Sequence, residues 1–138
     1  MIGVIDASVT LCWILREEDM LVADELFAQI ADQGAVVPGI WRLEVANALQ
    51  VGIRRQRIDA AYRDAAIRQL ALLPVDTDTE TTEHARTRTL YLSEVHGLTV
   101  YDAAYLELAM RRGVAFATRH VELAGAAQKT GVKLLPVR

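Results

Sequence analysis

Short apolar runs alternate along this chain with longer segments in which apolar residues recur every three or four positions. The short runs indicate buried strands, and the longer segments indicate amphipathic helices. We expect strands at residues 2–5, 35–37, 72–75, 114–117 and 133–137. We expect helices at residues 8–16, 19–32, 40–55, 59–70, 79–95, 99–113 and 121–129. This alternation favours a three-layer α-β-α fold with a short, mostly parallel central sheet of about four to five strands.

Single residues mark the ends of several of these helices. Ser8 could cap the first helix, and Asp59 is a candidate cap for the fourth, because short polar side chains satisfy free N–H groups at a helix start. Gly97 and Gly113 suit helix ends, where the chain often adopts a left-handed conformation. The third helix is expected to bury a face whose members recur at helical spacing. This face consists of Leu43, Ala46, Leu49 and Ile53.

The composition fits one globular domain that spans residues 1–138. With 138 residues and 52% hydrophobic content, the chain can bury a core. A formal net charge of −3 disfavours an ordinary basic nucleic-acid-binding module, but it allows local attraction to a nucleic acid. Cys12, the single cysteine, cannot form an internal disulfide, and no signal-peptide or membrane-spanning pattern is present. We therefore expect a cytoplasmic protein.

Three acidic residues occupy positions that a parallel α/β fold could bring together. Asp6 directly follows the first strand, at the carboxyl end where such sheets carry functional residues. Asp6 could itself cap the helix that starts at Ser8, but Ser8 could also do so, which would leave the carboxylate of Asp6 without a structural task. Glu44 lies in the third helix, three residues before Asn47 on the same face. Asp102 lies in a first helical turn, where capping alone would also explain it.

A cluster of three carboxylates would repel itself unless something compensated its charge. A divalent cation removes this conflict, and all-oxygen ligation suits Mg²⁺ or Mn²⁺ better than Zn²⁺. One or two such ions can activate water and stabilise the leaving oxygen in phosphodiester hydrolysis.

Four stretches of the chain resemble the PIN domain family in order and spacing. They are Val-Ile-Asp-Ala-Ser at residues 4–8, Glu-Val-Ala-Asn-Ala-Leu at 44–49, Leu-Thr-Val-Tyr-Asp-Ala-Ala-Tyr at 98–105 and Phe-Ala-Thr-Arg-His-Val-Glu-Leu at 116–123. The short length is similar to that of VapC toxins from type II toxin–antitoxin pairs. This resemblance implies a metal-dependent endoribonuclease that uses Mg²⁺ or Mn²⁺, pairs with a small antitoxin protein and forms a homodimer.

The same resemblance implies roles for individual residues. Asp6, Glu44 and Asp102 would be the metal-binding and catalytic acids, and Ser8 and Thr118 would support them through hydrogen bonds. Asn47, beside Glu44, is a further supporting candidate.

One position departs from the family pattern. The family commonly carries a fourth acid two residues after the Thr of its Ala-Thr turn, and this chain has His120 there. Glu122 follows two residues later and is the nearest acid that could replace it. A neutral imidazole can still bind Mn²⁺ or position water or phosphate. The change puts a second metal ion in doubt more than the first.

Two basic groups end helices. Arg54, Arg55 and Arg57 end the third helix, and Arg111 and Arg112 end the helix at residues 99–113. Basic residues in a last turn suit the helix dipole. The first group is also a candidate for guiding an RNA backbone, because guanidinium groups fit phosphates.

Two other functions stay open. A degenerate, catalytically weak PIN domain would bind RNA or an antitoxin without cutting RNA efficiently. A haloacid-dehalogenase-like phosphatase also begins with an Asp at a strand end, but it needs a second Asp where Ser8 stands.

Overall fold

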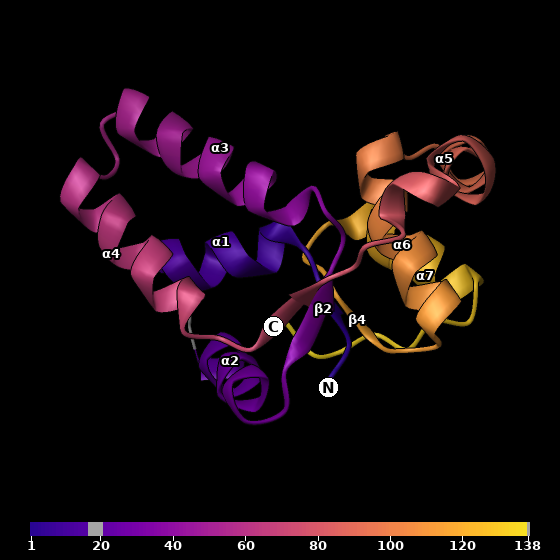
Figure 1. Ribbon diagram of the computed structural model, residues 1–138, viewed down its shortest axis with the longest axis horizontal. Coiled ribbons are helices and arrows are strands. Elements are labelled where there is room, and N and C mark those ends of the chain that lie inside the picture. The colour runs from indigo at the N-terminus through magenta and orange to yellow at the C-terminus, as the bar shows by residue number, and fades with distance from the viewer. Residues whose placement is uncertain (17–20, 138) are drawn as a thin grey trace.

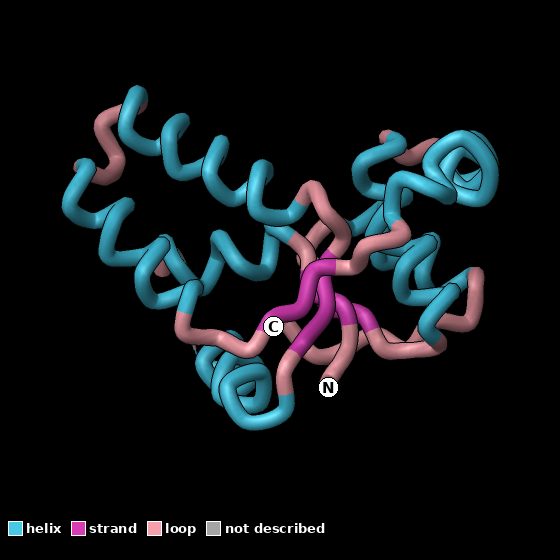
Figure 2. The backbone as a smooth tube through the Cα atoms, viewed as in Figure 1, coloured by secondary structure: helices cyan, strands magenta, loops and turns pink. Residues whose placement is uncertain are grey.

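A four-stranded, all-parallel sheet lies between two groups of helices in the computed structural model, which describes residues 1–16 and 21–137. The strands are β1 (Val4–Ile5), β2 (Ala35–Val37), β3 (Val75–Thr77) and β4 (Phe116–Ala117), in the order β3-β2-β1-β4. β1 is therefore an interior strand, with Val4 paired to Val36 on one side and to Phe116 on the other. Figure 2 shows these short strands together at the centre of the molecule. The predicted three-layer α/β fold is confirmed.

The helices divide into two groups, one on each side of the sheet (Figure 1). The first group contains α1 (Ala7–Leu15), α2 (Leu21–Gln33), α3 (Trp41–Arg54) and α4 (Ala60–Ala71). The second contains the 3-10 turn η1 (Thr81–His84), the π turn η2 (Ala85–Thr89), α5 (Leu90–His96), α6 (Val100–Arg112) and α7 (Val121–Lys129). In the described part of the chain, no helix has the length and apolar character needed to cross a membrane.

Several predicted elements differ from the observed ones. The strand expected at 72–75 begins only after Pro74, which has no N–H group to donate to a sheet. The helix expected at 79–95 is divided into η1, η2 and α5. Its first half is rich in threonine, which has weak helix propensity. The strand expected at 133–137 contributes one bridge, from Leu134 to Phe116. The predicted start of the second helix, at residue 19, lies outside the described residues.

The predicted buried face of α3 is largely wrong. The helix buries Trp41, Val45, Leu49 and Gly52. Of the predicted face only Leu49 is among them, and Leu43 is 72% exposed. Both sets recur at helical spacing, so periodicity alone could not separate them. Contact with α1 selects the observed face, where the Trp41 indole donates a hydrogen bond to the Thr10 hydroxyl at 3.0 Å.

A buried ion network joins the end of β3 to α6. The carboxylates of Asp78 and Glu107 are fully buried, and the Arg111 guanidinium donates to both, at 2.7 and 2.8 Å. Arg112 also donates to Asp78, at 3.1 Å. Although burial alone would raise the pKa of Asp78, hydrogen bonds from Arg111, Thr81 and Arg112 hold it well below its usual value. The network fixes the C-terminal half of α6, the helix that begins next to Asp102.

Candidate metal centre at the carboxyl edge of the sheet

Asp6 lies directly after β1 and is almost fully buried. Its Oδ1 accepts hydrogen bonds from the Ser8 hydroxyl at 2.7 Å and from the Val9 amide at 3.0 Å. Its Oδ2 accepts a hydrogen bond from the Thr118 hydroxyl, which β4 presents from the neighbouring strand. Of the two residues that could cap α1, Asp6 is the N-cap and Ser8 is not. One carboxylate therefore caps the helix and faces the carboxyl edge of the sheet.

Glu44 comes from the first turn of α3 and is half-buried. Its Oε1 accepts a hydrogen bond from the Tyr105 hydroxyl at 2.5 Å. Sequence reasoning missed Tyr105, which is separated from Glu44 by 61 positions. A signal was present nonetheless, since Tyr105 follows Asp102 by three residues and so lies on the same face of one helix.

Asp102 comes from the first turn of α6. Its backbone amide donates to the Thr99 hydroxyl at 3.0 Å, so Thr99 caps this helix. Its carboxylate is partly exposed, and Oδ2 lies 3.9 Å from Nδ1 of His120. Three elements distant in sequence thus bring one acid each to the same edge of the sheet.

The charges of these acids act on one another. Burial raises the pKa of Asp6 above its usual value, and the negative charge of Asp102 adds to this, against the hydrogen bonds from Thr118, Ser8 and Val9. Burial also raises the pKa of Glu44, with further contributions from the charges of Asp102 and Asp6, while the Tyr105 hydrogen bond opposes the rise. The three carboxylates are therefore close enough to repel. Such an all-oxygen donor set, short of positive charge, fits a hard divalent cation.

Of the supporting candidates beyond β4, Thr118 contacts Asp6 and His120 lies near Asp102. His120 is the N-cap of α7, where its Nδ1 accepts a hydrogen bond from the Leu123 amide at 3.3 Å. Its Nε2 lies 3.2 Å from the carboxylate of Glu122, which is 72% exposed. The imidazole therefore caps α7 and lies near Asp102, at a distance too long for a hydrogen bond. Glu122 is largely exposed to solvent.

The candidates along α3 are less close to the acids. Asn47 is exposed one turn after Glu44. Arg54, Arg55 and Arg57 are exposed at the far end of this helix. Eleven residues from Glu44 to Arg55 correspond to roughly 16 Å along the helix axis. The structure therefore separates the arginines from the acidic centre.

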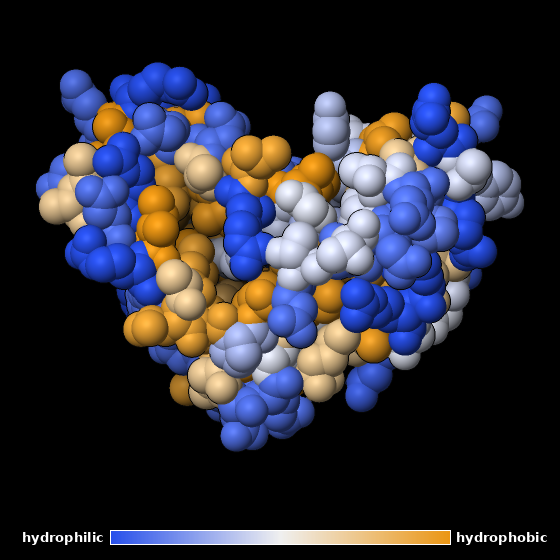
Figure 3. Space-filling view, in the orientation of Figure 1, coloured by the Kyte–Doolittle hydropathy of each residue, from blue (hydrophilic) through white to orange (hydrophobic). Residues whose placement is uncertain are grey.

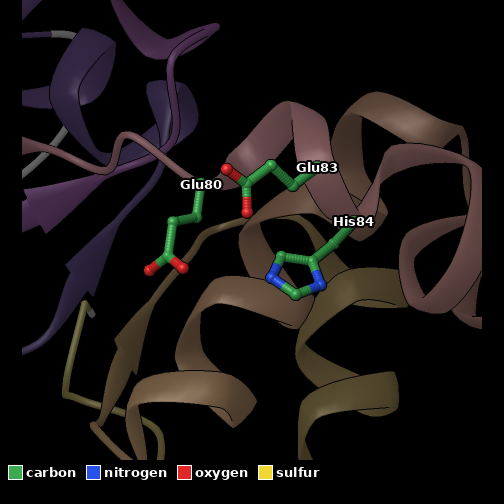
Figure 4. Close-up of side chains that lie close together, drawn as sticks. All are labelled: Glu80, Glu83 and His84. Carbon is green, nitrogen blue, oxygen red and sulfur yellow. The ribbon is translucent and has the colours of Figure 1, made fainter.

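A second group of potential ligands lies at η1. The side chains of Glu80, Glu83 and His84 each offer one ligand atom, and these atoms lie within 4.8 Å of one another (Figure 4). No other three His, Cys, Asp or Glu side chains in the described part of the chain meet that spacing, so Asp6, Glu44 and Asp102 are more widely spaced. The two glutamates of this group are exposed, and Glu80 also lies 3.5 Å from Arg111. Exposed acids of this kind are solvated without a metal.

Comparisons with known proteins agree on one fold. The sequence model described as PIN domain matches residues 3–128. No curated protein matches the chain. The crystal structure of PAE2754 from Pyrobaculum aerophilum is similar, with 22% identity, a TM-score of 0.70 and coverage of 96% of this chain and 89% of that one. VapBC2 from Rickettsia felis, bound to a DNA fragment from its promoter, has 11% identity, a TM-score of 0.66 and 98% coverage of both chains. FitAcB from Neisseria gonorrhoeae has 12% identity, a TM-score of 0.66 and coverage of 97% and 96%.

Proposed function

This chain belongs to the PIN domain family, and from that premise we propose that it is a metal-dependent endoribonuclease with its centre at Asp6, Glu44 and Asp102. PIN domains are generally nucleases and typically use divalent metal ions. The observation that carries the proposal is the convergence of three carboxylates, one each from β1, α3 and α6, at the carboxyl edge of the sheet. Burial, with a further contribution from the neighbouring acids, raises the pKa values of Asp6 and Glu44, which supports a cation at this edge of the sheet.

The residues present fit such an ion. Each oxygen of Asp6 already accepts hydrogen bonds, which fix the carboxylate and leave lone-pair capacity on Oδ2. No described residue donates a hydrogen bond to Oε2 of Glu44, which leaves this oxygen available beside the Oε1 that Tyr105 contacts. Bound Mg²⁺ or Mn²⁺, as one ion or two, would supply an activated water and a countercharge for the leaving oxygen. Asp6, Glu44 and Asp102 hold and orient the site, and no covalent intermediate on the protein is needed.

Metal-dependent RNA cleavage by the purified protein tests this proposal. We expect cleavage of structured RNA with Mg²⁺ or Mn²⁺, and a loss of at least about 100-fold with EDTA, because the metal contributes several kcal/mol of charge stabilisation. Excess Mg²⁺ should restore the rate. DNA of the same sequence is the matched control for RNA specificity. Intact RNA under all metal conditions would contradict the proposal.

The alternative is a degenerate PIN domain that binds RNA or an antitoxin but cuts weakly, and His120 is the observation that favours it. His120→Asp restores the family's acid and keeps a capping side chain at the start of α7. We expect this variant to bind Mn²⁺ about tenfold more tightly in calorimetry, as the extra carboxylate adds charge beside Asp102.

His120→Asn is the control for this change, since it caps without charge. Equal Mn²⁺ affinity in the two variants would show that position 120 does not face the metal. RNA cleavage that appears only in His120→Asp would favour the degenerate domain over an active nuclease.

The proposed partners are RNA, a small antitoxin protein and a second copy of the chain in a homodimer. In this proposal, residues 1–138 form a single nuclease domain that acts in the cytoplasm as a toxin, as the similarity to VapC toxins implies. Arg54, Arg55 and Arg57 would guide the RNA backbone.

An exposed apolar surface supports a protein partner. Figure 3 shows apolar side chains gathered between α3 and α4. A pocket of about 240 Å³ there is lined by Trp41, Arg42, Val45, Ala46, Ile67, Leu70, Ala71, Leu73 and Val75.

A further inference from the structure

We propose that Tyr105 is a positioning residue that fixes the carboxylate of Glu44 for metal binding, an inference that rests on the proposed nuclease function. The Tyr105 hydroxyl donates to Oε1 of Glu44 at 2.5 Å. Tyr105 is only 1% exposed, although the carboxylate it contacts is half-buried. Phe would fill the same space in the core as Tyr105. The hydroxyl therefore adds something that packing does not need, namely a hydrogen bond to the proposed metal ligand Glu44.

The ring of Tyr105 is rigidly held. It stacks on Phe116 of β4, with ring centroids 6.4 Å apart and planes 15° apart. Phe116 is fully buried and stands two residues before Thr118, which holds Asp6. α6 therefore places Asp102 directly and Glu44 through Tyr105, while β4 supports both Tyr105 and Asp6.

Glu44 needs such support more than the other two acids. A glutamate side chain has several rotatable bonds, and fixing it costs conformational entropy. Asp6 has three hydrogen-bond donors, whereas the described residues offer the Glu44 carboxylate only Tyr105. Loss of such an outer partner of a metal ligand typically costs about 10–100-fold in metal affinity.

Tyr105→Phe tests this inference, because it removes one oxygen and keeps the ring. We expect Mn²⁺ affinity, measured by calorimetry, to fall about 10–100-fold, and kcat for RNA cleavage at fixed Mn²⁺ to fall with KM for RNA unchanged. Tyr62→Phe is the matched control. The Tyr62 hydroxyl also donates at 2.5 Å, to the backbone oxygen of Ile14 in α1, well away from the acids. Its loss should lower stability and leave Mn²⁺ affinity unchanged.

A double-mutant cycle with Glu44→Gln separates positioning from a general loss of structure. If Tyr105 acts through Glu44, Tyr105→Phe should cause no further loss of Mn²⁺ affinity in the Glu44→Gln background. The inference would be overturned if Tyr105→Phe lowered Mn²⁺ affinity as much in the Glu44→Gln background as in the parent protein. It would also be overturned if Tyr105→Phe and Tyr62→Phe changed Mn²⁺ affinity equally. Wild-type Mn²⁺ affinity in Tyr105→Phe, with a parent protein that binds Mn²⁺ and cleaves RNA, would overturn the positioning role alone. A parent protein that binds no Mn²⁺ would overturn the proposed function as well.

Discussion

Asp6→Asn is expected to lower metal-dependent RNA cleavage by about 1,000-fold, since several kcal/mol of metal-derived charge stabilisation depend on an anionic ligand. Asn keeps the shape of Asp6 and an oxygen that can accept the hydrogen bonds from Ser8 and Val9. The loss should therefore come from the charge and not from the cap of α1. Cleavage rates at saturating Mg²⁺, with circular dichroism to show an intact fold, measure it. Asp24→Asn, which changes an exposed acid paired with Arg16, is the matched control.

In the absence of metal, Asp6→Asn should become more stable relative to the parent protein as pH rises. The pKa of Asp6 is higher in the folded protein than its ordinary value of 3.8, so the folded state holds this proton more tightly than the unfolded state. Stability contributed by Asp6 therefore falls as pH rises above the ordinary value and through the raised pKa. Asn does not titrate, so Asp6→Asn removes this part of the pH dependence of stability. In EDTA, urea unfolding at pH 4 and pH 7 should show a smaller loss of stability between these two values in the variant than in the parent. If the stability of Asp6→Asn changed with pH as much as that of the parent, the raised pKa of Asp6 would be contradicted. RNA cleavage by this variant at the parent rate would contradict the proposed role of Asp6 at the metal.

The order of elements and the place of Asp6 follow from local pattern, which explains why both could be predicted. A short apolar run followed at once by Asp is visible in the chain, and parallel α/β connectivity places the end of β1 at the sheet edge. Which stripe of α3 is buried could not be predicted, because Leu43 and Val45 both begin apolar series at helical spacing. Packing against α1 makes that choice, and packing is a tertiary property.

The candidate site shows the same division. Asp6, Glu44 and Asp102 were nominated from their positions and from the PIN resemblance, and the structure brings them to one edge. Their hydrogen-bond partners depend on distances between remote segments. Tyr105 lies on the same face of α6 as Asp102, but its contact with Glu44 is known only once α3 is seen to pass beside it. Likewise, Arg111 suits the end of α6 as a favourable partner of the helix dipole, and only the structure shows that it faces buried acids.

Arg111→Met is expected to lower the free energy of unfolding by about 3–5 kcal/mol, the usual effect of removing one partner from a buried ion pair. Arg111 pairs with two fully buried carboxylates, and Glu107 has no other hydrogen-bond partner among the described residues. Met would keep the apolar part of the side chain and strand the charge of Glu107 in the core. Urea unfolding at pH 7 measures the change. The hydrogen bonds from Arg111 hold the pKa of Asp78 below its usual value. The stability that Asp78 contributes through Arg111 is therefore present above about pH 4 and is lost as pH falls further.

Two further variants identify the stranded charge as the cause. Arg16→Met breaks an exposed ion pair with Asp24 and should cost about 0–1 kcal/mol, so it controls for the loss of an arginine. Arg111→Met combined with Glu107→Gln should recover part of the loss, because the remaining side chain is neutral and cheaper to bury. If the double variant is less stable than Arg111→Met alone, the network stabilises the protein through its hydrogen-bond geometry and not through charge compensation. If Arg111→Met lowers the free energy of unfolding no more than Arg16→Met does, the buried ion network between the end of β3 and α6 does not form in solution. The position of α6, and with it Asp102, would then depend on apolar packing.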